Sequence, residues 1–180
     1  MKKLLSLLIT TLLISACTSH TKVSAPGVVT SCDQIRLLGS ADKFSMLGCL
    51  DGSSEINFHQ IKGPLLINVW GSWCEGCKQE MPYFVELYQN PLFKSGQIQM
   101  LGINVEEKSK NDAIEYIQKS GMSWPNLEDS SGISKSIFGP GVPVTWFIDE
   151  NGKNIETKIG AYTNKMQLFN QVEKAFRVKL

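Results

Sequence analysis

Histidine is scarce in this sequence of 180 residues, which contains only His20 and His59. A structural zinc site usually needs two close ligand pairs, such as a CxxC with a second CxxC or an HxxxH. The sequence has a single CxxC, Cys74 and Cys77, and no second pair accompanies it. Covalent haem attachment needs a histidine directly after the second cysteine, and that position is Lys78. These absences argue against a metal site and against attached haem, and they predict that the protein needs no cofactor.

Charge of one sign is not in excess, and long apolar runs are missing. The 18 basic and 17 acidic residues give a formal net charge of +1, which does not favour nucleic acid as a partner. A membrane-spanning helix needs about 20 apolar residues, and no stretch is that long. Residues 4–14 form the longest apolar-rich run, directly after Lys2 and Lys3. That arrangement is typical of a secretory signal peptide.

The run ends in Ile14-Ser15-Ala16-Cys17, which resembles the lipobox of bacterial lipoproteins. In such proteins the cysteine becomes the first residue of the mature chain and carries lipid. The alternative is an ordinary signal peptide with a coincidental cysteine. The lipobox predicts a protein anchored in the cell membrane by lipid on Cys17, on the extracytoplasmic face or in the periplasm.

Three segments follow from this interpretation. Residues 1–16 are the signal peptide, residues 17–42 are a tether and N-terminal extension, and residues 43–180 form one domain. The tether is expected to be flexible over 18–31 because it is rich in Ser, Thr, Pro and Gly. The 164 residues after the signal peptide are enough for a domain with its own core.

The chain contains five cysteines. If lipid takes Cys17, four remain, and thiols outside the cytoplasm tend to pair. Cys74 and Cys77 are close enough to pair with each other, which leaves Cys32 and Cys49. A bridge between those two would close a loop of 18 residues and contribute about 3 kcal/mol by loop entropy. The alternative is that Cys32 and Cys49 are free buried thiols.

Apolar patterning predicts alternating strands and helices. Strands are expected at 44–50, briefly within 51–63, at 64–70, at 97–105, and as two strands joined by a turn at 149–152. Helices are expected from Cys74 to a stop near Pro91, with a kink at Pro82, and at 110–120, 134–138 and 164–178. This alternation predicts an α/β fold with a central sheet.

The CxxC lies where the apolar strand 64–70 gives way to a helix. A dithiol couple needs one accessible thiolate to attack and a second thiol to resolve the mixed disulfide. Cys74 falls at the helix N-terminus, where unpaired N–H groups and the helix dipole favour a thiolate. Cys77 lies one turn later on the apolar face, where it is shielded. Redox chemistry is therefore the favoured function of this pair.

Two stretches, WGSWCEGCKQEMP (70–82) and GVPVTWFIDENGK (141–153), together resemble the TlpA/ResA-like branch of the thioredoxin superfamily. Its members are membrane-tethered bacterial thiol–disulfide oxidoreductases, and the resemblance covers residues 44–178. It implies a thioredoxin fold with an N-terminal β-hairpin and a central αβ insertion at 97–120. It also implies that Cys74 is the nucleophile and Cys77 the resolving cysteine.

The resemblance assigns roles to three further residues. Pro143 would follow a cis peptide bond and face the cysteines, although X–Pro bonds in general are cis in only about 5–6% of cases. The Val142 backbone would then pair with a substrate peptide. Glu80 matches the glutamate of CxxCxxE, which lines the active-site cavity, exchanges protons with Cys77 and disfavours a nearby thiolate. The alternative for Glu80 is a solvated helix residue.

The spacer between the cysteines departs from the family pattern. Gly76 stands where proline is common, and Glu75 adds a negative charge beside Cys74. Both changes should stabilise the Cys74 thiolate less, which favours a reductant. Of the flanking tryptophans, Trp73 is expected to be exposed contact surface for substrate and Trp70 to be core; simple packing of both is the alternative.

The leading hypothesis is thus an extracytoplasmic thiol–disulfide oxidoreductase that keeps exported proteins reduced. By resemblance, apocytochrome c is the best-known client class, and a membrane electron donor would supply the electrons. A disulfide-forming oxidase on the same fold is the second hypothesis, and a lipoprotein binding module with a structural CxxC is the third. A peroxidase is less favoured, because that chemistry uses a single cysteine in a Pro/Thr-rich loop, which is absent.

Overall fold

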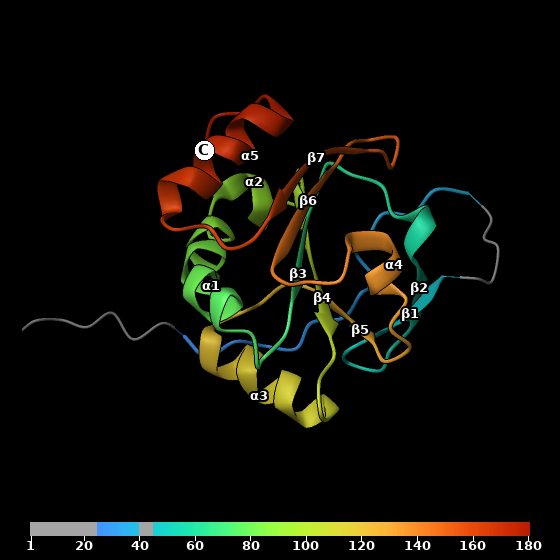
Figure 1. Ribbon diagram of the computed structural model, residues 1–180. Coiled ribbons are helices and arrows are strands. Elements are labelled where there is room, and N and C mark those ends of the chain that lie inside the picture. Colours follow the sequence, from blue (N-terminus) through green and yellow to red (C-terminus); the bar gives the residue numbers. More distant parts are fainter. Residues whose placement is uncertain (1–24, 40–44) are drawn as a thin grey trace, which may run out of the picture.

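A computed structural model describes residues 25–39 and 45–180, shown in Figure 1. The described residues form one sheet of seven strands in the order β2-β1-β5-β4-β3-β6-β7. The strands are β1 Met46–Cys49, β2 Glu55–Asn57, β3 Leu65–Trp70, β4 Gln99–Val105, β5 Asn126–Asp129, β6 Val144–Ile148 and β7 Asn154–Ile159. The helices are α1 Glu75–Leu87, α2 Pro91–Lys94, α3 Lys110–Ser120, α4 Ser134–Phe138 and α5 Lys165–Phe176.

The sheet is mixed, and β3 is an interior strand of it, between β4 and β6. β3 pairs with β4 in parallel and with β6 antiparallel, and β4 pairs with β5 in parallel. Every residue of β3 is buried, as expected for an apolar strand covered on both faces. The β1–β2 hairpin is the expected N-terminal hairpin, and the strand and helix expected at 97–120 are β4 and α3. The α/β thioredoxin-type architecture is confirmed.

Two apolar cores lie on opposite faces of the sheet. The first contains buried side chains of α1, α3 and α5, such as Phe84, Ile117 and Leu168. The second lies under α4 and the N-terminal segment and contains Phe138 and Ile35. Figure 1 shows α1 and α5 on one side of the sheet and α4 on the other. The first core supports the helix that carries the two cysteines.

The N-terminal segment differs from the expected flexible tether where the structure describes it. The Gly27 N–H donates to the Gln118 carbonyl at 2.9 Å, and the Val28 N–H donates to the Met122 carbonyl at 2.7 Å. Cys32 is disulfide-bonded to Cys49, as predicted, with 6.0 Å between their Cα atoms. The tether prediction is therefore wrong for residues 25–31, because backbone bonds to α3 and the loop after it dock this segment. Cys17 and the rest of the tether lie outside the described residues.

Two other local predictions need correction. α1 ends at Leu87, and Pro91 begins the short helix α2, where Asn90 accepts from the Leu92 N–H at 2.9 Å. Proline suits that first position because its missing N–H has no partner in a helix anyway. β5 was not expected, since its sequence lies in a polar stretch before a turn. It forms because β4 and β1 pair with it from either side.

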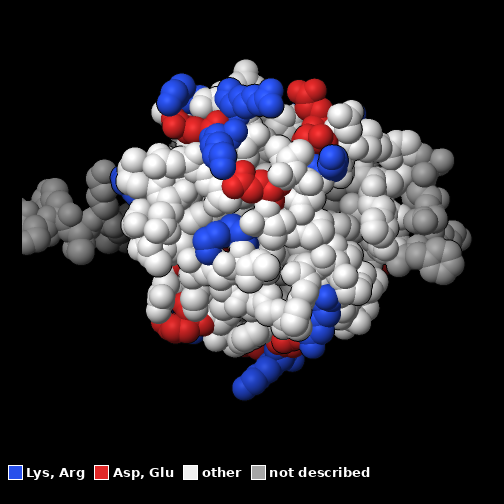
Figure 2. All heavy atoms as spheres, turned by 45° about the horizontal axis from the view of Figure 1, so that its top comes forward, with Lys and Arg blue, Asp and Glu red and all other residues white. Residues whose placement is uncertain are grey.

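The described residues contain no helix long and apolar enough to cross a membrane. Figure 2 displays lysines and arginines beside acidic residues on the face that it shows, rather than a field of one sign. Lys165 and Glu86 form one of the surface ion pairs, 2.8 Å apart.

Candidate active site

The CxxC lies at the start of α1, as the sequence predicts. Cys74 is the N-cap residue, and its Sγ accepts from the Cys77 N–H at 3.1 Å. The two sulfurs form a disulfide, and their Cα atoms are 5.2 Å apart. Cys74 is 5% exposed and Cys77 is 0% exposed. Access from solvent is therefore restricted to Cys74, and a thiolate there would be stabilised by the N–H groups of the helix terminus.

Pro143 lies against this site. The Val142–Pro143 peptide bond is cis, as the resemblance implied. A Cβ atom added to Gly76 would lie 3.4 Å from Cδ of Pro143 and 3.5 Å from Cβ of Ala161. The Gly160 N–H donates to the Pro143 carbonyl at 2.9 Å. The loop before β6 and the loop after β7 thus meet at the spacer of the CxxC.

Glu80 lies on α1 about one helical turn after Cys77 and is 0% exposed, so the alternative of a solvated helix glutamate is wrong. Its Oε1 accepts from Nδ2 of Asn68 at 3.1 Å, and its Oε2 accepts from the Tyr162 N–H at 2.9 Å. Burial raises the pKa of Glu80 to about 7, while the two hydrogen bonds and the charge of Lys158 act in the opposite direction. A carboxyl group with this pKa can exchange a proton near neutral pH.

Asn68 is a partner that the sequence analysis missed. It lies in the middle of β3 and is buried, and its Oδ1 has no hydrogen-bond partner among the described residues. If the side-chain amide of Asn68 flips, this oxygen faces Glu80 in place of the NH₂ group. Asn68 can therefore donate to ionised Glu80 or accept from protonated Glu80. A polar residue inside the apolar run PLLINVW was the available signal.

Two tyrosines complete the surroundings of Glu80. Burial raises the pKa of Tyr116 to about 12, and the charge of Glu80 acts in the same direction. Burial and Glu80 also raise the pKa of Tyr162. Its phenol donates to Oε1 of Gln171 at 2.6 Å. Both phenols therefore stay neutral at physiological pH.

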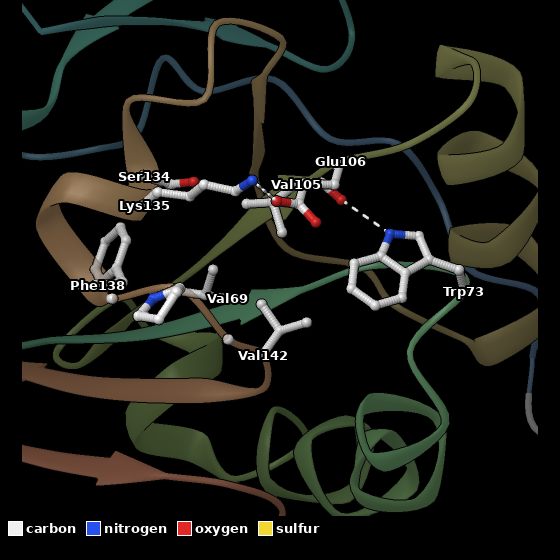
Figure 3. Close-up of a pocket in the computed structure, with 11 residues that line it drawn as sticks. Val69, Trp73, Val105, Glu106, Ser134, Lys135, Phe138 and Val142 are labelled. Atoms are coloured by element: carbon white, nitrogen blue, oxygen red, sulfur yellow. Dashed lines mark hydrogen bonds and ion pairs between the residues drawn. The ribbon is translucent and has the colours of Figure 1, made fainter.

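A groove runs from Trp73 to the loop before Pro143, as Figure 3 shows. Trp73 is 48% exposed, and its Nε1 donates to the Val105 carbonyl at 3.3 Å, while Trp70 is fully buried, as expected. Val142 and Phe138 supply the opposite apolar wall. An ion pair of Lys135 with Glu106 forms the polar rim. The remaining lining residues are Val69, Ser134, Gly139, Pro140 and Gly141.

Glu107 fixes the loop that leads into the CxxC, and it too was missed. Its Oε1 accepts from the Ser72 N–H at 2.5 Å, and its Oε2 accepts from the Ser72 hydroxyl at 2.7 Å. Nδ2 of Asn104 also donates to Oε1, at 2.8 Å. Because Ser72 precedes Trp73 and Cys74, this network orients the exposed indole. No local pattern links residues 35 positions apart.

The charge on Glu75 affects the cysteines less than the sequence suggested. Its carboxylate is 3.8 Å from the Lys78 ammonium, and the two side chains are 74% and 43% exposed. An exposed pair of this kind is screened by water. Within residues 25–39 and 45–180, no three His, Cys, Asp or Glu side chains are grouped to hold a metal ion.

Comparisons with known proteins identify the family of this chain. The sequence profile of the AhpC/TSA family matches residues 40–156. The thiol-disulfide oxidoreductase ResA of Geobacillus thermodenitrificans is 31% identical over 130 residues, which cover 71% of this chain and 72% of that protein.

Solved structures share the fold. A secreted Mycobacterium tuberculosis disulfide oxidoreductase homologous to E. coli DsbE superimposes with a TM-score of 0.61 at 17% identity, over 72% of this chain and 94% of that one. The exposed lipoprotein thioredoxin Etrx1 of Streptococcus pneumoniae superimposes with a TM-score of 0.54 at 22% identity, over 72% and 97%.

Proposed function

Because the chain belongs to the AhpC/TSA family and is a thiol–disulfide oxidoreductase of the ResA/DsbE type, we propose that it reduces disulfides of exported proteins while anchored to a membrane. The observation that carries this proposal is the unequal access of the two sulfurs. Cys74 reaches solvent at the helix N-terminus, and Cys77 lies behind it, next to a buried carboxyl group.

The proposed reaction transfers two electrons from the enzyme to the client. The Cys74 thiolate attacks one sulfur of the client disulfide, which forms a mixed disulfide and releases the other client sulfur as a thiolate. The Cys77 thiolate then attacks Sγ of Cys74. This step breaks the mixed disulfide, frees the second client sulfur and leaves the Cys74–Cys77 disulfide. A membrane electron donor returns the enzyme to the dithiol state.

Glu80 is the proposed general base for the second attack. The Cys77 thiol must lose its proton before it attacks, and both residues are fully buried one helical turn apart. Water therefore does not reach this thiol directly. Since the pKa of Glu80 is about 7, its carboxylate is available to accept that proton near neutral pH.

The groove beside Trp73 is the proposed client site. Trp73, Val142 and Phe138 give this groove an apolar lining, and Trp73 directly precedes Cys74 in the chain. A client segment that places its cysteine at Cys74 could lay a neighbouring apolar side chain in this groove, beside the Val142 backbone and Pro143. Apocytochrome c, with its CxxCH segment, is the proposed client, and the enzyme would act in cytochrome c biogenesis.

Membrane anchoring through Cys17 rests on the lipobox-like segment and on the likeness to a neighbour described as an exposed lipoprotein. We expect Cys17→Ser to leave the membrane fraction, because the mature chain then has no lipid. Cell fractionation of both versions tests this, and thiol exchange by the released variant controls for folding. Continued sedimentation of Cys17→Ser with membranes would refute lipid anchoring.

Trapping of mixed disulfides tests the proposed reaction. Cys77→Ala lacks the resolving thiol and should accumulate covalent complexes through Cys74, whereas the matched variant Cys74→Ala should capture few. Mass spectrometry of the complexes then identifies the clients. Equal capture by both variants would contradict the assigned roles, and a client set without CxxCH proteins would exclude apocytochrome c.

A further inference from the structure

Lys158 lies on β7 and reaches toward the loop that follows this strand. Its ammonium donates to three successive carbonyl oxygens: Ile159 at 2.8 Å, Gly160 at 2.8 Å and Ala161 at 3.4 Å. Its Nζ is also 5.4 Å from the centre of the Tyr162 ring. The side chain is only partly exposed. The loop that it binds lies against the spacer of the CxxC, because a Cβ atom on Gly76 would be 3.5 Å from Cβ of Ala161.

The last of these bonds leads directly to Glu80. The carbonyl of Ala161 and the N–H of Tyr162 belong to the same peptide group. That N–H donates to Oε2 of Glu80 at 2.9 Å. One peptide group therefore accepts from the Lys158 ammonium at its oxygen and donates to the Glu80 carboxyl at its nitrogen. A peptide placed between a cation and an anion is polarised by both, which strengthens each bond.

The geometry points to Lys158 as a positioning residue of the redox centre: through the Ala161–Tyr162 peptide group, it holds Glu80 in place and favours its carboxylate form. The role of this carboxylate in proton transfer rests on the proposed function. The bridge itself is a property of the fold and can be measured without any client.

The other groups around Glu80 are neutral or lie on its own helix. Asn68 faces it from β3, Tyr116 from α3, and Tyr162 from the loop before α5. The two cysteines lie at the start of α1. Among the groups that act on the pKa of Glu80, Lys158 is the one with a full charge, and it opposes the effect of burial. Glu75 and Glu156 act on the two tyrosines instead.

The test measures the titration of the Glu80 carboxyl group directly. In the full-length, oxidised protein, the ¹³C signal of this carboxyl is titrated by NMR and assigned by its loss in Glu80→Gln. We expect Lys158→Met to raise the titration midpoint by about half a pH unit, less than the 1–3 units produced by a cation in direct contact. Lys158→Arg should keep the wild-type midpoint, and so should the control Lys153→Met, which removes an exposed charge before β7.

Lys158→Gln separates the effect of charge from that of hydrogen bonding, because its side-chain amide removes the charge but still donates to the loop carbonyls. It also serves as the test if Lys158→Met does not fold. Its midpoint should also rise. A wild-type midpoint in Lys158→Met or Lys158→Gln would overturn the inference, and so would an arginine variant that shifts as the methionine variant does.

A second measurement separates this inference from the proposed function. The pH profile of thiol alkylation in the reduced protein should move with the carboxyl midpoint in Lys158→Met. A shifted midpoint with an unchanged alkylation profile would support the bridge and refute proton transfer by Glu80.

Discussion

Glu80 is a fully buried carboxyl group, and burial disfavours the charged form that proton transfer requires. Its pKa of about 7 lies above the ordinary value of 4.5, because burial penalises the carboxylate more than Asn68, Tyr162 and Lys158 stabilise it. The folded protein thus binds this proton more tightly than the unfolded chain does. The resulting stabilisation is complete below about pH 4.5 and is lost as the pH rises through about 7. The difference between the two pKa values corresponds to about 3 kcal/mol.

Glutamine does not titrate, so we expect the Glu80→Gln variant not to lose this stability as the pH rises. Relative to the wild type, its free energy of unfolding should rise by about 2–3 kcal/mol between pH 4.5 and pH 8. Urea unfolding of the oxidised proteins at both pH values measures the difference. Glu86→Gln, an exposed substitution on the same helix, should follow the wild type. Parallel pH dependence of Glu80→Gln and the wild type would contradict a raised pKa.

The second residue-scale prediction concerns Asn68, which can satisfy Glu80 in both protonation states. Leucine of similar size removes both the donor and the acceptor, and it leaves Oε1 of Glu80 without its partner at 3.1 Å. A hydrogen bond to the ionised carboxylate is stronger than one to the neutral acid, so losing Asn68 should raise the pKa of Glu80 in Asn68→Leu. The ¹³C titration of Glu80 measures this change. An unchanged or lower midpoint would show that the Asn68 bond does not stabilise the carboxylate.

At the scale of elements, the N-terminal segment is tied down despite its lack of regular structure. The Arg36 guanidinium donates to Oε1 of Gln99 at 2.9 Å and to the carbonyls of Pro64, Gly96 and Gln97 at 3.3 Å. The disulfide to β1 holds the same segment, and Cys32 and Cys49 are almost fully buried. Burial shields both sulfurs from an attacking thiolate.

The Cys32–Cys49 bridge should therefore remain intact when the Cys74–Cys77 pair is reduced. Structural disulfides typically have potentials below about −300 mV. Alkylation after mild reduction, followed by peptide mass mapping, should label only the active-site cysteines. Labelled Cys32 and Cys49 together with an oxidised active-site pair would reverse this assignment. Replacing both Cys32 and Cys49 by alanine should lower the free energy of unfolding by about 3 kcal/mol.

At the scale of the whole molecule, redox direction depends on how well the fold stabilises the dithiol relative to the disulfide. The exposed pair of Glu75 with Lys78 leaves little net charge beside Cys74. The buried carboxyl of Glu80 opposes a thiolate at Cys77, and Gly76 leaves the first turn of α1 without a stiff residue. Apart from the N–H groups of the helix terminus, little in this site stabilises a thiolate, and a weakly stabilised dithiol corresponds to a low reduction potential.

We expect the potential of the Cys74–Cys77 couple to lie near about −270 mV, the value of thioredoxin, rather than near about −120 mV, the value of the oxidant DsbA. Equilibration of the purified protein in glutathione and dithiothreitol buffers, with quantification of free thiols, measures it. A potential near the oxidant value would identify the protein as a disulfide-forming oxidase.

Local patterns in the sequence were sufficient to predict the chemistry and most of the elements. The single CxxC after an apolar strand predicted a redox couple at a helix N-terminus. The five-cysteine count predicted the pairing of Cys32 with Cys49, and apolar periodicity predicted β3, α1 and α3. These features depend on residues that are close together in the chain, so their spacing alone carries the information.

Only the tertiary structure decided what surrounds the couple. The Tyr162 N–H that binds Glu80 lies 82 positions further along the chain, and the Glu107 carboxylate that holds Ser72 lies 35 positions away. β5 formed from a polar stretch because strands on both sides pair with it. Such contacts arise when the two cores pack the sheet between its helices, and neither periodicity nor spacing records which distant groups then meet. The sequence predicted which sulfurs form the redox couple, and packing decided which groups surround them.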